Sequence, residues 1–138
     1  MWVSERRNEI YTLIKFRAKN NLVSKYPDIY FTQDDEQIIE TKLPTIFING
    51  LSGTEIAKTI EGKTTNGMLF DYEIKVTVGK KQGQAVADEV MWEVCSQFKK
   101  LGFWYIQSPS FIRSNNAAVQ EMVARMRRNI GASDRIQF

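Results

Sequence analysis

The stretch FDYEIKVTVG, residues 70–79, alternates apolar and polar side chains along its whole length. The apolar members are Phe70, Tyr72, Ile74, Val76 and Val78. A period of two is typical of a β-strand with one buried and one solvated face. We therefore expect residues 70–79 to lie in an antiparallel sheet that is covered on one side.

The residues before this stretch predict a second strand and a hairpin. LPTIFI, residues 43–48, is short, β-branched and aromatic, with its proline near the start, where no ladder donor is lost. Residues 49–62 are polar and contain glycine, and Asn66-Gly67 then stands between two strand-like segments. Asn-Gly is a strong signal for a tight turn. We expect a long polar loop over 49–62, a turn at 64–67, and a hairpin that projects from the domain.

Two segments have the apolar spacing of helices. In residues 82–101 the apolar side chains recur every three or four positions, and Gly102 follows where a left-handed residue would end a helix. Residues 4–23 show the same spacing, with Ser4 as the candidate N-cap. Cys95 lies beside the apolar stripe of the first of these segments, which favours a buried structural thiol over a reactive one.

The C-terminal third is less uniform. FWYI, residues 103–106, resumes strand character, and Ser108-Pro109-Ser110 should bend or bulge that strand. The apolar residues of 119–130 fit helical spacing slightly better than strand alternation. Periodicity alone therefore leaves helix and strand both open there, before a short polar tail over 132–138.

Residues 28–40 form an acidic connection that contains no Lys or Arg, with space for one short strand at 29–31. Asp34, Asp35 and Glu36 are its densest cluster. The acidic residues lack the order of a calcium loop, so an exposed linker is the better interpretation and a cation site the weaker one.

These elements together predict one α+β domain. A chain of 138 residues that is 43% hydrophobic has the size and composition of one compact unit. We expect a mainly antiparallel sheet with two helices packed on one face, built from an N-terminal helix over 4–23 and a core over 43–131.

The composition argues against most catalytic chemistry. The sequence contains no histidine and one cysteine, which excludes His-based triads, His metal sites and an intrachain disulfide. Residues 50–59 resemble a phosphate loop only superficially, because Lys58 and Thr59 lack the preceding glycine. We expect no catalytic residue, no cofactor and no metal, and the absence of a long apolar stretch predicts a soluble protein without a membrane partner.

Charged residues are the best candidates for contact surfaces. The net charge of +3 is too small to indicate nucleic acid by itself, but residues 113–138 are rich in arginine. The candidate interface residues are Asp34, Asp35, Glu36, Glu55, Lys58, Arg113, Arg125, Arg127 and Arg128. If 119–130 is a strand, Arg125 and Arg127 share one face and Arg128 lies on the other. Arginine suits carboxylates and phosphates, so an acidic protein surface, nucleic acid and a merely solvated face all stay open.

Four segments together resemble the tail terminator and related neck or tail-completion proteins of long-tailed bacteriophages. They are LPTIFI at 43–48, EGKTTNGMLFDYEIKVTV at 61–78, KKLGF at 99–103 and MVARMRRNIG at 122–131. The resemblance covers residues 40–131 and lies in the order and character of segments, with no catalytic signature. It implies an α/β fold in which the segment 119–130 is a strand, so we predict a strand there.

The resemblance also implies a function. Proteins of this family are structural virion components that form a ring, typically of six subunits, at the head–tail joint. The expected partners are copies of the same chain, the tail tube protein and the connector or stopper protein of the head, with DNA passing through the lumen. A head-completion or connector subunit is the alternative within the virion. A small nucleic-acid-binding module that uses the C-terminal arginines, with Trp104 and Tyr105 as stacking residues, is the alternative outside it.

Overall fold

The computed structural model describes residues 2–33, 43–58, 65–112 and 118–131. Within these ranges, two helices and five strands follow one another. They are α1 (Trp2–Leu22), β1 (Tyr30–Thr32), β2 (Thr45–Lys58), β3 (Thr65–Gly79), α2 (Gly83–Lys100), β4 (Trp104–Ile112) and β5 (Val119–Gly131). Neither helix is long and apolar enough to cross a membrane, within the ranges just given.

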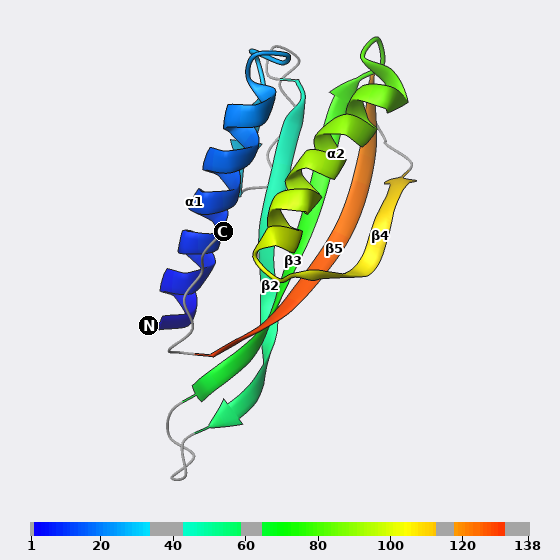
Figure 1. The fold of residues 1–138 in the computed structure, drawn as a ribbon. Coiled ribbons are helices and arrows are strands. Elements are labelled where there is room, and N and C mark those ends of the chain that lie inside the picture. Colours follow the sequence, from blue (N-terminus) through cyan, green and yellow to red (C-terminus); the bar gives the residue numbers. More distant parts are fainter. Residues whose placement is uncertain (1, 34–42, 59–64, 113–117, 132–138) are drawn as a thin grey trace.

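The strands form one sheet in the order β1-β2-β3-β5-β4. Both helices lie on the same face of this sheet, with α1 beside β2 and α2 across β3 and β5 (Figure 1). The pairs β2–β3, β3–β5 and β4–β5 are antiparallel, whereas β1 pairs in parallel with Thr45–Phe47 of β2. The expected α+β domain with two helices on one face is confirmed, with one parallel pair added at the edge.

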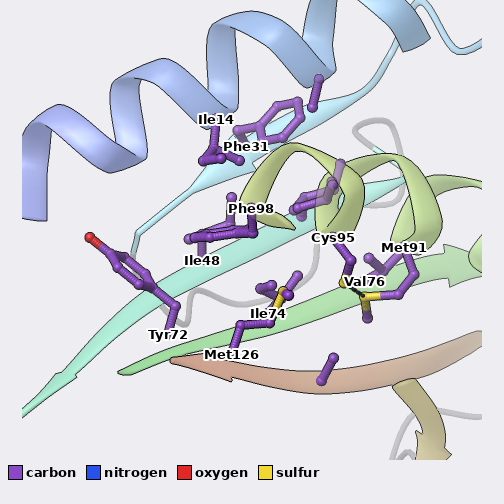
Figure 2. Packing of buried hydrophobic residues seen from close by; sticks show 14 of the residues in the cluster. Ile14, Phe31, Ile48, Tyr72, Ile74, Val76, Met91, Cys95, Phe98 and Met126 are labelled. Atoms are coloured by element: carbon purple, nitrogen blue, oxygen red, sulfur yellow. Dashed lines mark hydrogen bonds between the residues drawn. The ribbon is translucent and has the colours of Figure 1, made fainter. Parts of the chain in front are cut away.

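The core fills the space between the helices and the sheet. Ile74 and Val76 of β3 point toward the helices and are fully buried, as their place in the alternating stretch predicts. Figure 2 shows Ile48 and Met126 on the same side as Ile74, below the residues of α1 and α2. The rings of Tyr72, Phe98 and Phe103 form a cluster with centroids 5.1–5.7 Å apart.

The two helices follow the spacing of their apolar residues. α2 buries the expected stripe, and Gly102 after it has φ +90°, as a left-handed end of a helix requires. Ile10, Ile14, Ala18 and Leu22 of α1 are buried in the core that both helices share with the sheet. Ser4 as N-cap is wrong, because α1 begins at Trp2 and Ser4 lies within its first turn.

Polar contacts hold the end of α1 to α2. The Glu89 carboxylate accepts hydrogen bonds from Lys25 Nζ at 2.8 Å and from the Tyr26 hydroxyl at 2.6 Å. The hydrogen bond from Lys25, and to a smaller extent the one from Tyr26, lowers the pKa of Glu89. Burial, together with the bond to Glu89, raises the pKa of Tyr26 to about 12. The C-terminal end of α1 is therefore attached to α2 by polar groups as well as by the core.

The hairpin is built differently from the prediction. β2 continues to Lys58, so the expected loop over 49–62 is a strand for most of its length. Asn66-Gly67 is not a turn: both residues lie in β3, where Gly67 pairs with Ala57 and Thr65 pairs with Lys58. Pairing with β3 satisfies the backbone groups of these polar residues, and the pairing is irregular between Leu51 and Lys58. The paired strands extend past the helices, so the predicted projection is present (Figure 1).

The C-terminal strands agree with the prediction. β4 runs through Pro109 with register shifts on both sides of Gln107, which is the expected bulging. β5 is a strand along its whole length and lies between β3 and β4. Helical spacing appeared there because the first part of β5 has buried apolar residues on both faces: Met122 and Met126 face the helices, while Val119 and Val123 are buried on the other side.

Candidate interface surfaces

The sheet face opposite the helices carries cross-strand ion pairs between β3 and β5. Asp71 lies opposite Arg127, and Glu73 lies opposite Arg125. Both arginines therefore share a face, as predicted, but each is placed beside an acidic side chain of this chain. We call this surface the ion-pair face, defined by Asp71, Glu73, Lys75, Glu121, Arg125 and Arg127.

Arg127 makes the best-defined pair on the ion-pair face. Its Nε and Nη2 donate to the two Asp71 oxygens at 2.7 and 2.9 Å, which is bidentate geometry. These bonds raise the pKa of the Arg127 guanidinium above its ordinary value. The Nε–Nη2 edge of the guanidinium is therefore already occupied by a carboxylate of the same chain.

The remaining pairs on this face are weaker. Arg125 Nη2 donates to Glu73 Oε2 at 3.0 Å, and Lys75 Nζ lies 3.9 Å from Glu121 Oε2. The Lys75 ammonium also lies 5.4 Å from the centroid of the Phe47 ring, which is buried although it points away from the helices. Acidic and basic groups therefore balance along the ion-pair face, which presents alternating charge rather than a basic patch.

Arg128 points to the helix side of the sheet, as predicted for the neighbour of Arg127. Its Nη1 donates to the Leu101 carbonyl at 2.7 Å, just beyond the last residue of α2. A cation at a helix C-terminus satisfies an otherwise unpartnered carbonyl and interacts favourably with the helix dipole. Arg128 therefore stabilises the end of α2, a role that the sequence did not indicate.

The positions of the other candidate side chains lie outside the description. Asp34, Asp35, Glu36 and Arg113 lie outside the described residues, as does the acidic connection apart from its first part. The backbone of Glu55 and Lys58 belongs to the distal half of β2, but their side chains also lie outside the description.

Trp104 and Tyr105 point to opposite faces of β4. In the register between β4 and β5, Trp104 lies opposite Arg127 on the ion-pair side, and Tyr105 lies opposite Met126 on the helix side. Lys99 Nζ lies 4.5 Å from the Tyr105 ring centroid and 5.9 Å from that of Trp92. The two aromatic residues therefore do not lie on one surface with Arg125 and Arg127.

Cys95 is fully buried within α2, as predicted. Its Sγ lies 3.6 Å from Met91 Sδ (Figure 2). Burial raises the pKa of the thiol to about 11, with smaller opposing effects from Tyr105 and Lys99. The environment therefore suppresses the thiolate.

We expect Cys95 to resist thiol reagents at pH 8 unless the protein unfolds. The raised pKa keeps the thiol protonated, and the absence of an exposed sulfur surface blocks access. Labelling with a chromogenic disulfide reagent should proceed at the unfolding rate and become fast in denaturant. Rapid labelling of the folded protein, with no dependence on denaturant, would contradict this burial.

Within the described part of the chain, no three acidic or cysteine side chains are grouped as a metal site would need. No model of a known protein family and no curated protein matches the sequence. The surfaces must therefore be interpreted from their own chemistry.

Sequence reasoning missed the partners of the arginines and the exposure of β4. Asp71 and Glu73 were visible as the polar side of an alternating strand, but their pairing with Arg127 and Arg125 depends on the register between β3 and β5. The apolar composition of residues 103–112 was visible as well, whereas its position at the edge of the sheet follows only from the strand order.

Proposed function

We propose that this chain is a structural virion protein, a tail terminator that caps the tail tube as an oligomeric ring at the head–tail joint of a long-tailed bacteriophage. The observation that carries the proposal is that residues 119–131 form a strand, β5. Residues 119–130 fit helical spacing slightly better, but the resemblance to tail terminators requires a strand there. A strand at Val119–Gly131, between β3 and β4, agrees with the resemblance.

The shape of the domain supports a role in assembly. A closed ring uses head-to-tail contacts, so each subunit needs two different surfaces that fit each other. The β2–β3 hairpin extends past the helices and offers a projection that can reach a neighbour or the tail tube (Figure 1). The two outer strands of the sheet differ: β1 has three residues and is mostly buried, whereas β4 has nine residues, of which seven are exposed.

A reconstruction of the phage particle tests the proposal directly. We expect copies of this fold to form a ring between the tail tube and the connector or stopper protein, with DNA passing through the lumen. A monomer in the particle, or a position away from the neck, would contradict it. Copies that contact only head proteins would instead identify a head-completion or connector subunit.

The nucleic-acid alternative loses its main support because Arg125 and Arg127 are paired with carboxylates. We expect the wild-type protein to pass a DNA column at physiological salt. The double variant Asp71→Asn with Glu73→Gln leaves both arginines without their carboxylate partners, and it should be retained and eluted by salt. Salt-dependent retention of the wild type that is lost in Arg125→Ala with Arg127→Ala would favour the nucleic-acid module instead.

A further inference from the structure

β4 is the most exposed strand for which burial is described along the full length. Seven of its nine residues are exposed, and β5 is its only strand neighbour within the described chain. In Figure 1 it stands at the margin of the sheet, beyond the cover of α2. Its outer backbone N–H and C=O groups therefore face away from the sheet without a described strand to pair with.

The exposed side chains of β4 are apolar to an unusual degree. The described chain has seven large hydrophobic side chains that are exposed, and four of them belong to this strand. They are Trp104, Ile106, Phe111 and Ile112. Trp104–Ile112 contains no charged residue, whereas monomeric proteins usually place charged side chains on an edge strand to prevent it from pairing with another chain. Only Pro109 and the bulges beside it offer such protection, so the edge is suited to pairing with another strand.

The opposite side of the sheet has a second open edge. β1 pairs only with Thr45–Phe47, so Ile48–Lys58 of β2 has a described strand neighbour on one side alone, β3. The chemistry of a strand edge selects an extended backbone as its occupant. This chain therefore contains both an apolar edge in β4 and an edge in β2 long enough to receive it.

Strand directions make the two edges compatible in successive copies. β3 is antiparallel to β2, β5 to β3, and β4 to β5, so β4 runs opposite to β2. When copies repeat side by side in the same orientation, β4 of one copy meets β2 of the next as an antiparallel pair. A stagger along the strands places β4 beside Ile48–Lys58 rather than beside β1, and closed sheets generally require such a stagger.

We propose that β4 of one copy adds to the Ile48–Lys58 edge of β2 in the next copy, so that the sheet continues from subunit to subunit. This inference rests on the proposed ring and names the contact that builds it. The contact is heterologous, because different edges meet, as a ring requires. Burial of the four apolar side chains of β4 supplies its hydrophobic contribution.

Charge placed on β4 tests the contact. The variant Ile106→Lys with Ile112→Lys puts two cations into the proposed interface. We expect the dissociation constant of the assembly to rise by at least about 100-fold, because unpaired buried charges are strongly unfavourable. The matched control is Phe16→Lys with Val23→Lys, which makes the same charge change at two exposed apolar residues at α1. Sedimentation gives the mass of each assembly, and circular dichroism checks that each variant is folded.

Cross-linking identifies the two edges that meet. A copy carrying Gln107→Cys in β4 is mixed with a copy carrying Asn49→Cys in β2 and treated with a flexible bismaleimide; the native Cys95 is buried. We expect a covalent dimer in the mixture and little in either variant alone. A dimer of Gln107→Cys with itself would mean that two β4 edges meet, which would overturn the proposal.

The outcomes separate this inference from the proposed function. If the variant Ile106→Lys with Ile112→Lys forms the same rings as the wild type, the β4 contact is overturned and the ring role still stands. Assembly through β4 and β2 into open filaments would support the contact and contradict the ring. Equal loss of assembly in the β4 variant and in the control would overturn the contact. A wild type that stays monomeric at its highest soluble concentration would overturn it as well. In either case the particle reconstruction still decides the proposed function.

Discussion

Phe98→Ala should lower the free energy of unfolding by about 3–5 kcal/mol, the usual range for removing a large aromatic side chain from a core. Phe98 is fully buried on the face of α2 that meets the sheet. Its ring lies 5.2 Å from that of Tyr72 and 5.1 Å from that of Phe103, measured between centroids. The substitution removes the contact that joins α2, β3 and Phe103, the residue before β4, and the rigid sheet can fill the space only in part.

The control for this prediction is Phe16→Ala, the same chemical change on α1. Phe16 is 62% exposed, so its loss should change the free energy of unfolding by less than about 0.5 kcal/mol. Denaturant unfolding followed by circular dichroism measures both values. Equal effects at the two positions would mean that the aromatic cluster is not part of the core.

Gly50→Val should lower the free energy of unfolding by about 1–3 kcal/mol, the usual cost of overpacking. Gly50 lies in β2 beneath α1, and the side chain of Arg7 crosses it. A Cβ at position 50 would overlap Arg7 Cδ and lie 2.8 Å from both Arg7 Cγ and Nε. The middle of the Arg7 side chain must therefore move, although its backbone carbonyl accepts a hydrogen bond from the Tyr72 hydroxyl at 2.9 Å.

A second substitution separates overlap from a general effect on the strand. In the Arg7→Ala background the side chain that blocks the new Cβ is absent, so Gly50→Val should cost much less than it does in the wild type. Thermal unfolding of the two single variants and the double variant gives the comparison. An unchanged cost of Gly50→Val in the Arg7→Ala background would show that Arg7 does not determine the need for glycine.

The predictions from local periodicity succeeded where an element has one buried face. Residues 70–79 alternate because β3 meets the helices on one side only, and residues 82–101 repeat every three or four positions because α2 lies flat on the sheet. β5 follows neither pattern clearly, since Val119 and Val123 are buried on the face opposite to Met122 and Met126. Its assignment as a strand came from the resemblance, because burial on both faces removes the alternation.

Polarity misled the prediction of the hairpin. Residues 49–58 are mostly polar and contain glycine, so they have the composition of a loop, but antiparallel pairing with β3 satisfies their backbone groups. Asn66-Gly67 then became part of a strand because β2 extends far enough to pair with it. The length of a hairpin depends on the partner strand, and a local sequence window does not contain that partner.

The candidate interface changed for the same reason. Arg125, Arg127 and Arg128 were chosen as available cations, and alternation correctly predicted that Arg125 and Arg127 share one face while Arg128 lies on the other. Arg127 and Asp71 are 56 residues apart in the chain, and Arg128 and Leu101 are 27 residues apart. Register and helix placement bring these groups together, so most of the apparent basic surface is used within the subunit.

Composition and neighbours a few residues away are enough to predict the fold class, the two helices, the buried alternation of residues 70–79 and the absence of histidine chemistry. The pairing of the arginines, the length of the hairpin and the strand at the edge of the sheet become known only once the chain is folded. Those features depend on strand order and register, which are set by hydrogen bonds between distant segments. They moved the candidate contact surface from the arginines of β5 to the apolar edge of β4.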